Sequence, residues 1–500
     1  MYVFIFSINS NLIITFPKNK GDYFGPDGND PNDVTVKYGR AGNLNEYTAR
    51  SCSVVSQTTI NCETNDGVGL DLKWKVVIGG QQTTSLTTPM TTYALPTITG
   101  LSGDAVNTPS VTQGGVQLII DGTNFGPVTN NLVAAYYGRY ASPCKVKAGG
   151  TNSDCASATA DATTCAAVTT SGGSGNAANA CVFEYTTASC TVQSHTQIRC
   201  NTGPGVGDNL KWYVNIGYQD SSVFETITTR YANPHITGAA VAVGTTMNTD
   251  GTSRVAISGI NFGSTCTGCV EGKYGPTSGT KYSVLCDVTT SDTVLNCATT
   301  EGLGADHKWI VTRQSLSSTP SVQTVSYTPP EITSFTGTTT LSTSGGTELT
   351  ITGTNFGPVG NTEASATYGP AGGETKYVIS GCTVELDSGN VVMKCTTIAG
   401  VGGNLKIQLT VAGQTGSIGP TNVFLNYEAP TLTSLSGLAT GVSGSTTVGG
   451  ISITLTGQNF GPIRNNDVVV TYGPNTCIVT NTGTNNDCAT ATADASACAA

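Results

Sequence analysis

Five copies of one short pattern constrain this 500-residue chain more than any other feature. An Asn-Phe-Gly sequence or a close variant recurs along it, and a Tyr-Gly pair follows each copy. A period of about 100 residues is too long for a solenoid repeat and matches a small domain. The sequence therefore predicts a string of five similar domains. The phenylalanines are Phe24, Phe125, Phe262, Phe356 and Phe460, and the tyrosines are Tyr38, Tyr137, Tyr274, Tyr368 and Tyr472.

The composition and the residue pattern within one copy predict an all-β fold. Glycine is abundant (62 residues) and only 11% of residues are charged, which suits short strands joined by tight turns better than helices. In the fourth copy, residues 348–352 and 405–411 alternate apolar and polar side chains, as half-buried strands do. Cys382 and Cys395 lie in a predicted hairpin between these segments. We expect each copy to be an antiparallel β-sandwich of about seven strands.

A recurring Tyr-x-x-Pro sequence sets the predicted boundaries, because it directly precedes each new copy at Pro96, Pro234, Pro330 and Pro430. We expect repeat 1 to begin close to or before Met1, and repeat 5 to stop within an insertion that it shares with repeat 2. A two-residue connection with a φ-restricted proline limits domain motion, so we expect an elongated, semi-rigid array. The predicted repeats are 1–95, 96–233 with a Cys-containing insertion at about 139–185, 234–329, 330–429 and 430–500.

These motifs resemble the IPT/TIG family of immunoglobulin-like domains. The resemblance rests on Pro-x-Ile-Thr at 330–333, on Leu-x-Ile-x-Gly-x-Asn-Phe-Gly at 349–357, on a Cys pair and on Tyr-x-x-Pro at 427–430. It extends over essentially the whole chain. The family occurs in plexin-type receptor ectodomains and in many surface proteins, so the resemblance implies tandem immunoglobulin-like sandwiches. It does not by itself imply one function.

A Cys pair occupies one equivalent place in four repeats, and the family resemblance implies that each pair forms a disulfide. A zinc site is the alternative, but it needs four ligands and each Cys pair supplies only two. Seventeen cysteines also favour an oxidising compartment. The pairs are Cys52 with Cys62, Cys190 with Cys200, Cys286 with Cys297, and Cys382 with Cys395.

Other cysteines lie in loops. Cys266 and Cys269 have the spacing of a redox motif, but they lie in a predicted all-β loop, so we expect a local disulfide. The insertion of repeat 2 is rich in Ala, Thr and Gly and cannot bury a core, so we expect its own disulfides to hold it. Its four cysteines allow three pairings. They are Cys144, Cys155, Cys165 and Cys181.

Several other functions are disfavoured. No Lys/Arg run exists, so nucleic acid is not an expected partner, and no apolar run is long enough for a membrane span. We expect no cofactor, no metal and no catalytic residues, because the three histidines are scattered over different repeats. Trp74, Trp212 and Trp309 are expected in the core, and the acidic stretch at 27–33 is only a weak calcium candidate.

The sequence therefore favours a non-enzymatic, extracellular structural or adhesive surface protein. Its expected partners are proteins or glycans at the cell surface, with self-association into fibres as a further option. Two alternatives remain open at this point. One is the ectodomain of a plexin-like signalling receptor, and the other is a set of accessory modules of a secreted carbohydrate-active enzyme.

Overall fold

A computed structural model describes most of the chain, and it divides into two compact units. The first unit comprises Met1–Val243, Arg254–Ala298 and Lys308–Thr324, and the second comprises Gly244–Ser253, Thr299–His307 and Val325–Ala500. We keep the predicted repeat boundaries as labels. The described residues are 4–8, 11–15, 34–56, 58–83, 90–139, 144–146, 181–183, 185–242, 244–336, 340–418, 424–437, 449–463 and 467–472.

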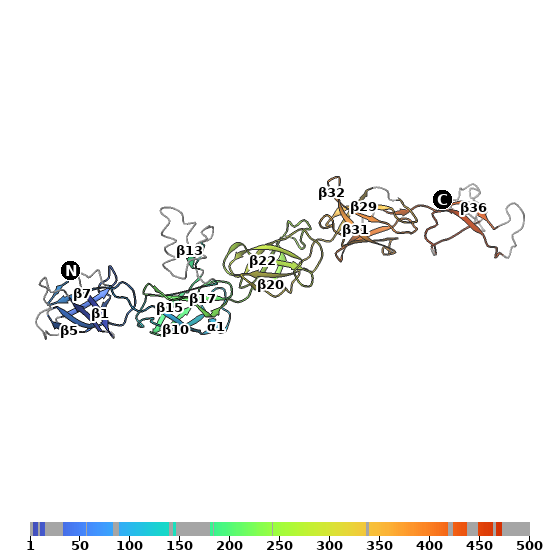
Figure 1. The fold of residues 1–500 in the computed structure, drawn as a ribbon. Coiled ribbons are helices and arrows are strands. Elements are labelled where there is room, and N and C mark those ends of the chain that lie inside the picture. Colours follow the sequence, from blue (N-terminus) through green and yellow to red (C-terminus); the bar gives the residue numbers. More distant parts are fainter. Residues whose placement is uncertain are drawn as a thin grey trace. The chain divides into compact units, whose positions relative to one another are not determined.

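The first unit holds the strands of repeats 1 to 3 and one short helix, α1 (Asp104–Asn107) (Figure 1). Repeat 1 contains β1 (Phe4–Ile8), β2 (Asn11–Thr15), β3 (Val34–Gly39), β4 (Tyr47–Thr48), β5 (Arg50–Ser56), β6 (Thr59–Glu63), β7 (Lys73–Ile78) and β8 (Gln81–Gln82). Repeat 2 contains β9 (Thr97–Ser102), β10 (Gln117–Thr123), β11 (Val133–Gly138), β12 (Cys144–Val146), β13 (Cys181–Phe183), β14 (Tyr185–Thr186), β15 (Ser189–Ser194), β16 (Gln197–Asn201), β17 (Leu210–Ile216), β18 (Gln219–Asp220) and β19 (Phe224–Thr229). Repeat 3 contains β20 (His235–Val241), β21 (Arg254–Ile260), β22 (Cys266–Gly275), β23 (Tyr282–Thr290), β24 (Val294–Ala298), β25 (Lys308–Arg313) and β26 (Leu316–Ser317).

The second unit holds the strands of repeat 4 and the described part of repeat 5. In repeat 5, β36 and β37 form an antiparallel pair. The strands are β27 (Glu331–Thr336), β28 (Thr340–Leu341), β29 (Glu348–Thr354), β30 (Ala364–Gly369), β31 (Tyr377–Asp387), β32 (Asn390–Thr396), β33 (Lys406–Val411), β34 (Gln414–Ile418), β35 (Asn426–Tyr427), β36 (Thr431–Ser436) and β37 (Thr454–Gln458).

Repeats 1 to 4 are antiparallel sandwiches, so the predicted all-β, immunoglobulin-like fold class is confirmed. Repeats 1 and 2 each have two four-stranded paths, with orders β1-β2-β6-β5 and β4-β3-β7-β8 in repeat 1 and β15-β16-β10-β9 and β14-β11-β17-β18 in repeat 2. In repeat 4 one long strand serves both layers, because β31 pairs with β30 through its first half and with β32 through its second. Repeat 3 uses β22 and β23 in the same continuous way.

The alternating pattern places large aromatic residues in the core. In β3 the side chains alternate, because Val34, Val36 and Tyr38 are buried in the core and the two residues between them are only partly buried. Trp74 stacks on Tyr38 with ring centroids 4.1 Å apart, and Trp212 stacks on Tyr137 at the same distance. All three tryptophans are completely buried, which confirms that they are core residues and not a ligand-binding row.

Five disulfides are present among the described residues, and four join adjacent strands of a hairpin. They are Cys52–Cys62, Cys190–Cys200, Cys286–Cys297, Cys382–Cys395 and the local Cys266–Cys269 bond. Within the insertion of repeat 2, β12 pairs with β13. Cys155 and Cys165 lie outside the described residues, and for Cys144 and Cys181 only the backbone is described, so the pairing of these four stays a prediction.

Candidate functional site: the joints between consecutive repeats

The first two joints each begin at a loop whose central apolar residue is held by a tyrosine hydroxyl. The Tyr47 hydroxyl accepts a hydrogen bond from the Val68 backbone N–H (3.1 Å) and donates one to the Val68 carbonyl (2.9 Å). Tyr185 holds Val206 in the same way, at 3.3 and 2.7 Å. Because both backbone groups are satisfied by one side chain, the loop is fixed while its apolar side chain projects away from it.

That apolar side chain enters the Asn-Phe-Gly turn of the next repeat. A Cβ added to Gly126 would overlap Cγ1 of Val68, and one added to Gly263 would lie 2.5 Å from Cγ1 of Val206. Both glycines have positive φ angles, 80° and 77°. Only glycine combines this backbone conformation with such a close approach. We call Val68, Val206 and Leu303 the inserted residues, and Gly126, Gly263 and Gly357 the receiving glycines.

The asparagine two residues before each receiving glycine forms a hydrogen bond with the segment that connects the two repeats. Asn124 has a φ of 62°, a left-handed conformation that asparagine tolerates better than most residues. Its side-chain amide donates to the carbonyl of Leu95, the residue before Pro96, at 2.8 Å. The same bond recurs at each later connection: Asn261 to Asn233, Asn355 to Pro329 and Asn459 to Ala429, at 3.2, 3.1 and 3.1 Å.

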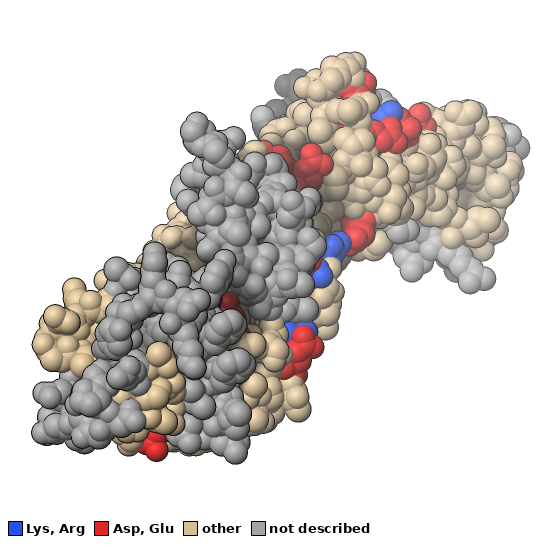
Figure 2. All heavy atoms as spheres, turned by 60° about the vertical axis from the view of Figure 1, so that its left-hand side comes forward, with Lys and Arg blue, Asp and Glu red and all other residues tan. Residues whose placement is uncertain are grey.

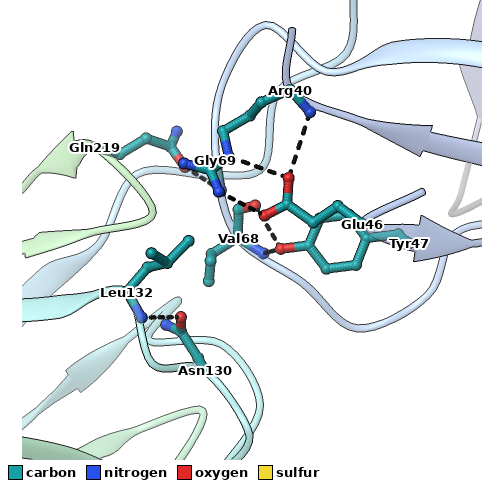
Figure 3. Close-up of polar contacts among 8 residues, drawn as sticks. All are labelled: Arg40, Glu46, Tyr47, Val68, Gly69, Asn130, Leu132 and Gln219. Carbon is teal, nitrogen blue, oxygen red and sulfur yellow. Dashed lines mark hydrogen bonds and ion pairs between the residues drawn. The ribbon is translucent and has the colours of Figure 1, made fainter. Parts of the chain in front are cut away.

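The first joint, between repeats 1 and 2, is closed by polar groups (Figure 3). Gln219 is 3% exposed; its side chain accepts from the Gly69 N–H (3.0 Å) and donates to the Tyr93 carbonyl (2.8 Å). Arg40 pairs with Glu46 at 3.1 Å and lies over the Tyr218 ring, 4.5 Å from its centroid. In Figure 3 the Val68 side chain points toward the turn in which Asn130 caps the N–H of Leu132.

The second joint, between repeats 2 and 3, places different groups around the same insertion. Leu316 stands where repeat 2 has Gln219, and it joins the hydrophobic core cluster of repeat 2. The buried Asp292 carboxylate accepts from the Thr112 hydroxyl and from the Gly263 N–H, the latter at 2.8 Å. The buried Arg313 guanidinium donates to the Phe262 carbonyl. Burial lowers the pKa of Arg313 from its ordinary value, although the nearby Asp292 charge opposes that shift.

The third joint lies within the second unit and repeats the design of the first. A Cβ on Gly357 would lie 2.6 Å from Cδ2 of Leu303, and Leu303 belongs to the core cluster of repeat 4. Gln414 donates to the Tyr327 carbonyl at 2.8 Å, as Gln219 does to Tyr93. The inserted residue and the receiving glycine therefore recur at all three joints for which both sides are described.

The Asn-Phe-Gly motif was recognised in the sequence as a marker of the repeats, but its role in the joint was missed. The inserted residues were missed altogether. One signal could have revealed the joint. The loop that holds the inserted residue and the Asn-Phe-Gly turn both recur in successive repeats, and each loop contacts the turn of the next repeat. The acidic stretch at 27–33 lies outside the described residues, and Asn130 serves as a turn cap, donating to the Phe125 carbonyl at 3.2 Å.

Surface charge is sparse on the face drawn in Figure 2, where acidic and basic residues lie among uncharged ones. Within the described ranges, no group of His, Cys, Asp and Glu has the arrangement of a metal site. Searching those same ranges finds no helix with the length and apolar character needed to cross a membrane.

The IPT/TIG domain family matches residues 330–427, which lie within predicted repeat 4. The resemblance seen in the sequence is thereby confirmed for predicted repeat 4, where residues 330–427 form an IPT/TIG domain. No curated protein matches the chain.

Three solved structures illustrate what the chain is similar to. The full extracellular region of plexin A4 shares 12% identity, covering 95% of this chain and 41% of its own, with a TM-score of 0.19. A tetra-tandem repeat from the extending region of a large adhesion protein shares 14% identity, covering 82% and 93%, with a TM-score of 0.24. The Escherichia coli adhesin FdeC shares 14% identity, covering 67% and 97%, with a TM-score of 0.18. The chain thus spans about two fifths of the plexin A4 region that it matches.

Proposed function

We propose that this chain is a non-enzymatic, extracellular structural or adhesive protein whose repeats are held in fixed succession by their joints. The observation that carries the proposal is the insertion of Val68, Val206 and Leu303 at Gly126, Gly263 and Gly357. A flexible string of independent domains would not need a buried, glycine-dependent contact at three successive boundaries. The array would present loops to proteins or glycans at a cell surface, with the insertion of repeat 2 as one such loop.

The disulfides support the extracellular part of this proposal, because such bonds persist in oxidising compartments. Each closes a loop of 10 to 13 residues, which stabilises a small sandwich by about 2–3 kcal/mol in the chain-entropy picture. We expect chain secreted by cells to show all eight of these cysteines protected from alkylation until reductant is added. Chain recovered with free thiols at these positions would contradict the localisation.

The joint itself is tested by small-angle scattering of the whole chain. Inserting a flexible Gly/Ser segment between Tyr93 and Pro96 should broaden the distance distribution and lower the maximum dimension, because repeats 1 and 2 would no longer be coupled. A matched control carries the same segment in the exposed turn at Gly79–Gly80, where an added Cβ would meet nothing within 4 Å. If both chains scatter like the unmodified one, the joints do not restrict the array and the proposal is wrong.

A further inference from the structure

We propose that the repeats are built to bear tension along the chain, and that a parallel pairing between the N-terminal and C-terminal segments of a repeat resists the load. The inference rests on the proposed structural role, but it concerns the interior of each repeat and not the joints.

Three parallel pairings carry this proposal. Ser110 pairs with Tyr231 in repeat 2, Met247 pairs with Tyr327, and β28 pairs with β35 in repeat 4. Among the strand pairings of the described residues, these three alone are parallel, and they fall at equivalent places.

The pairings are made of short backbone hydrogen bonds. The Ser110 N–H donates to Arg230 at 2.9 Å, and the Ala232 N–H donates back to Ser110 at 2.7 Å. Met247 exchanges two such bonds, both 2.8 Å long, with Ser326 and Thr328. In repeat 4 the Glu428 N–H donates to the Leu341 carbonyl at 2.9 Å.

Their direction determines how they would respond to force. The C-terminal segment ends three residues before the proline that begins the next repeat, so tension reaches it directly. Its parallel partner belongs to the N-terminal part of the same repeat and is drawn the opposite way. Two parallel strands pulled from opposite ends must slide past each other, which loads all their hydrogen bonds together. A hairpin pulled at its open end loses its bonds one at a time.

A buried tyrosine ties the loaded segment to the core. The Tyr231 hydroxyl shares a 2.6 Å hydrogen bond with the Tyr137 hydroxyl and donates to the Gly203 carbonyl at 2.6 Å. Tyr427 donates to the Ile398 carbonyl at 2.7 Å. Ala429 lies two residues after Tyr427, and its carbonyl accepts a hydrogen bond from the Asn459 side chain. Every Tyr-x-x-Pro sequence therefore couples a core anchor to the connection that would transmit the load.

The four hairpin disulfides are not in this path, because each links neighbouring strands of one hairpin. They shorten the length that an unfolding repeat releases without joining its two ends. Removing the Cys382–Cys395 bond, with a separation of 13 residues, should lengthen the release from repeat 4 by about 45 Å. That gain identifies the unfolding event of repeat 4 in a force trace.

The test pulls the full chain from both ends at constant force and compares three variants. Glu428→Pro removes the N–H that bonds to Leu341, Glu428→Ala keeps it, and Ala429→Pro reproduces the Pro329–Pro330 sequence that the chain already has one repeat earlier. We expect the unfolding rate of repeat 4 to rise about tenfold in Glu428→Pro and to change less than about twofold in the other two.

Equal rates in Glu428→Pro and Ala429→Pro would overturn the proposal. If Glu428→Pro abolishes the event of repeat 4, Ala232→Pro provides the same test in repeat 2, where it removes the bond to Ser110. An unchanged unfolding rate there also overturns it. Flexible joints in scattering together with a strong effect of Glu428→Pro would reject the proposed array and leave the load-bearing pairing intact.

Discussion

The first and second joints share one contact and differ in what surrounds it. Both insert a valine at a glycine of positive φ, Val68 at Gly126 and Val206 at Gly263. The first is closed by Gln219, which satisfies two backbone groups, whereas the second is closed by the apolar Leu316. The insertion therefore defines how neighbours dock, and the surrounding residues can be tuned to each pair.

The same contrast extends to the Asn-Phe-Gly turn. In repeat 2 the phenylalanine carbonyl accepts from Asn130, and in repeat 3 the corresponding carbonyl accepts from Arg313. The loop of repeat 3 has no asparagine at that place and contains the Cys266–Cys269 bond. The phenylalanine carbonyl thus keeps a donor, although the donor changes from a neutral side chain in the loop, Asn130, to a charged side chain in β25, Arg313. Satisfying buried polar groups is the constraint that both solutions meet.

The largest expected effect comes from blocking the shared contact. Gly126→Ala should lower the free energy of unfolding by about 3 kcal/mol or more, because a positive φ and overlap with Val68 both oppose the added methyl. Gly115→Ala is the matched control, since Gly115 has a φ of 83° but open space around it. Calorimetry of both variants separates the cost of the positive φ from the cost of the overlap with Val68.

A double-mutant cycle makes this prediction specific to the joint. Val68→Ala should recover part of the loss in Gly126→Ala and none in Gly115→Ala, because only the former pair is in contact. Additive losses in both pairs would mean that the methyl added at Gly126 does not meet Val68, which contradicts the contact at the first joint.

How far these features could be predicted depends on whether they recur. The sandwich fold, the buried tryptophans and the hairpin cysteines follow from periodicity, from a recurring motif and from a family resemblance. The insertion of Val68 at Gly126 could not be read in the same way, because the two residues belong to different repeats and each looks like an ordinary turn. The roles of Asp292 and Leu316 could not be predicted from the sequence either, since each occurs once and acts only through partners distant in sequence.

The next largest effect should break the second joint alone. Asp292→Ala removes the acceptor of the Thr112 hydroxyl and the Gly263 N–H, and it leaves the buried Arg313 without a nearby opposite charge. We expect a loss of about 2–4 kcal/mol, seen as faster hydrogen exchange in peptides around Gly263. Asp292 has a φ of 64°, and Asp292→Asn retains both an acceptor and the tolerance of that conformation, so it should lose clearly less. Equal exchange in all three chains would rule out this role for the carboxylate.

Converting the first joint into the second sharpens the comparison. Gln219→Leu leaves the Gly69 N–H and the Tyr93 carbonyl without their side-chain partner, so we expect a loss of about 1–3 kcal/mol. Exchange at the Gly69 amide should accelerate, while peptides at the second joint stay unchanged. Gln414→Leu provides a second instance at the third joint. A gain in stability would instead show that apolar packing is the better closure at every joint.

The smallest expected effect belongs to the rim of the first joint. Arg40 pairs with Glu46 and covers the Tyr218 ring, but its side chain keeps 28% of its exposure, so water and salt weaken both interactions. We expect Arg40→Ala to cost about 0.5–1 kcal/mol, with most of the loss disappearing at high salt. Arg50→Ala is a suitable control, because the ion pair of Arg50 with Asp66 is exposed and lies within repeat 1. If Arg40→Ala costs as much as Gln219→Leu, then the first joint is held from its rim as much as from its buried centre.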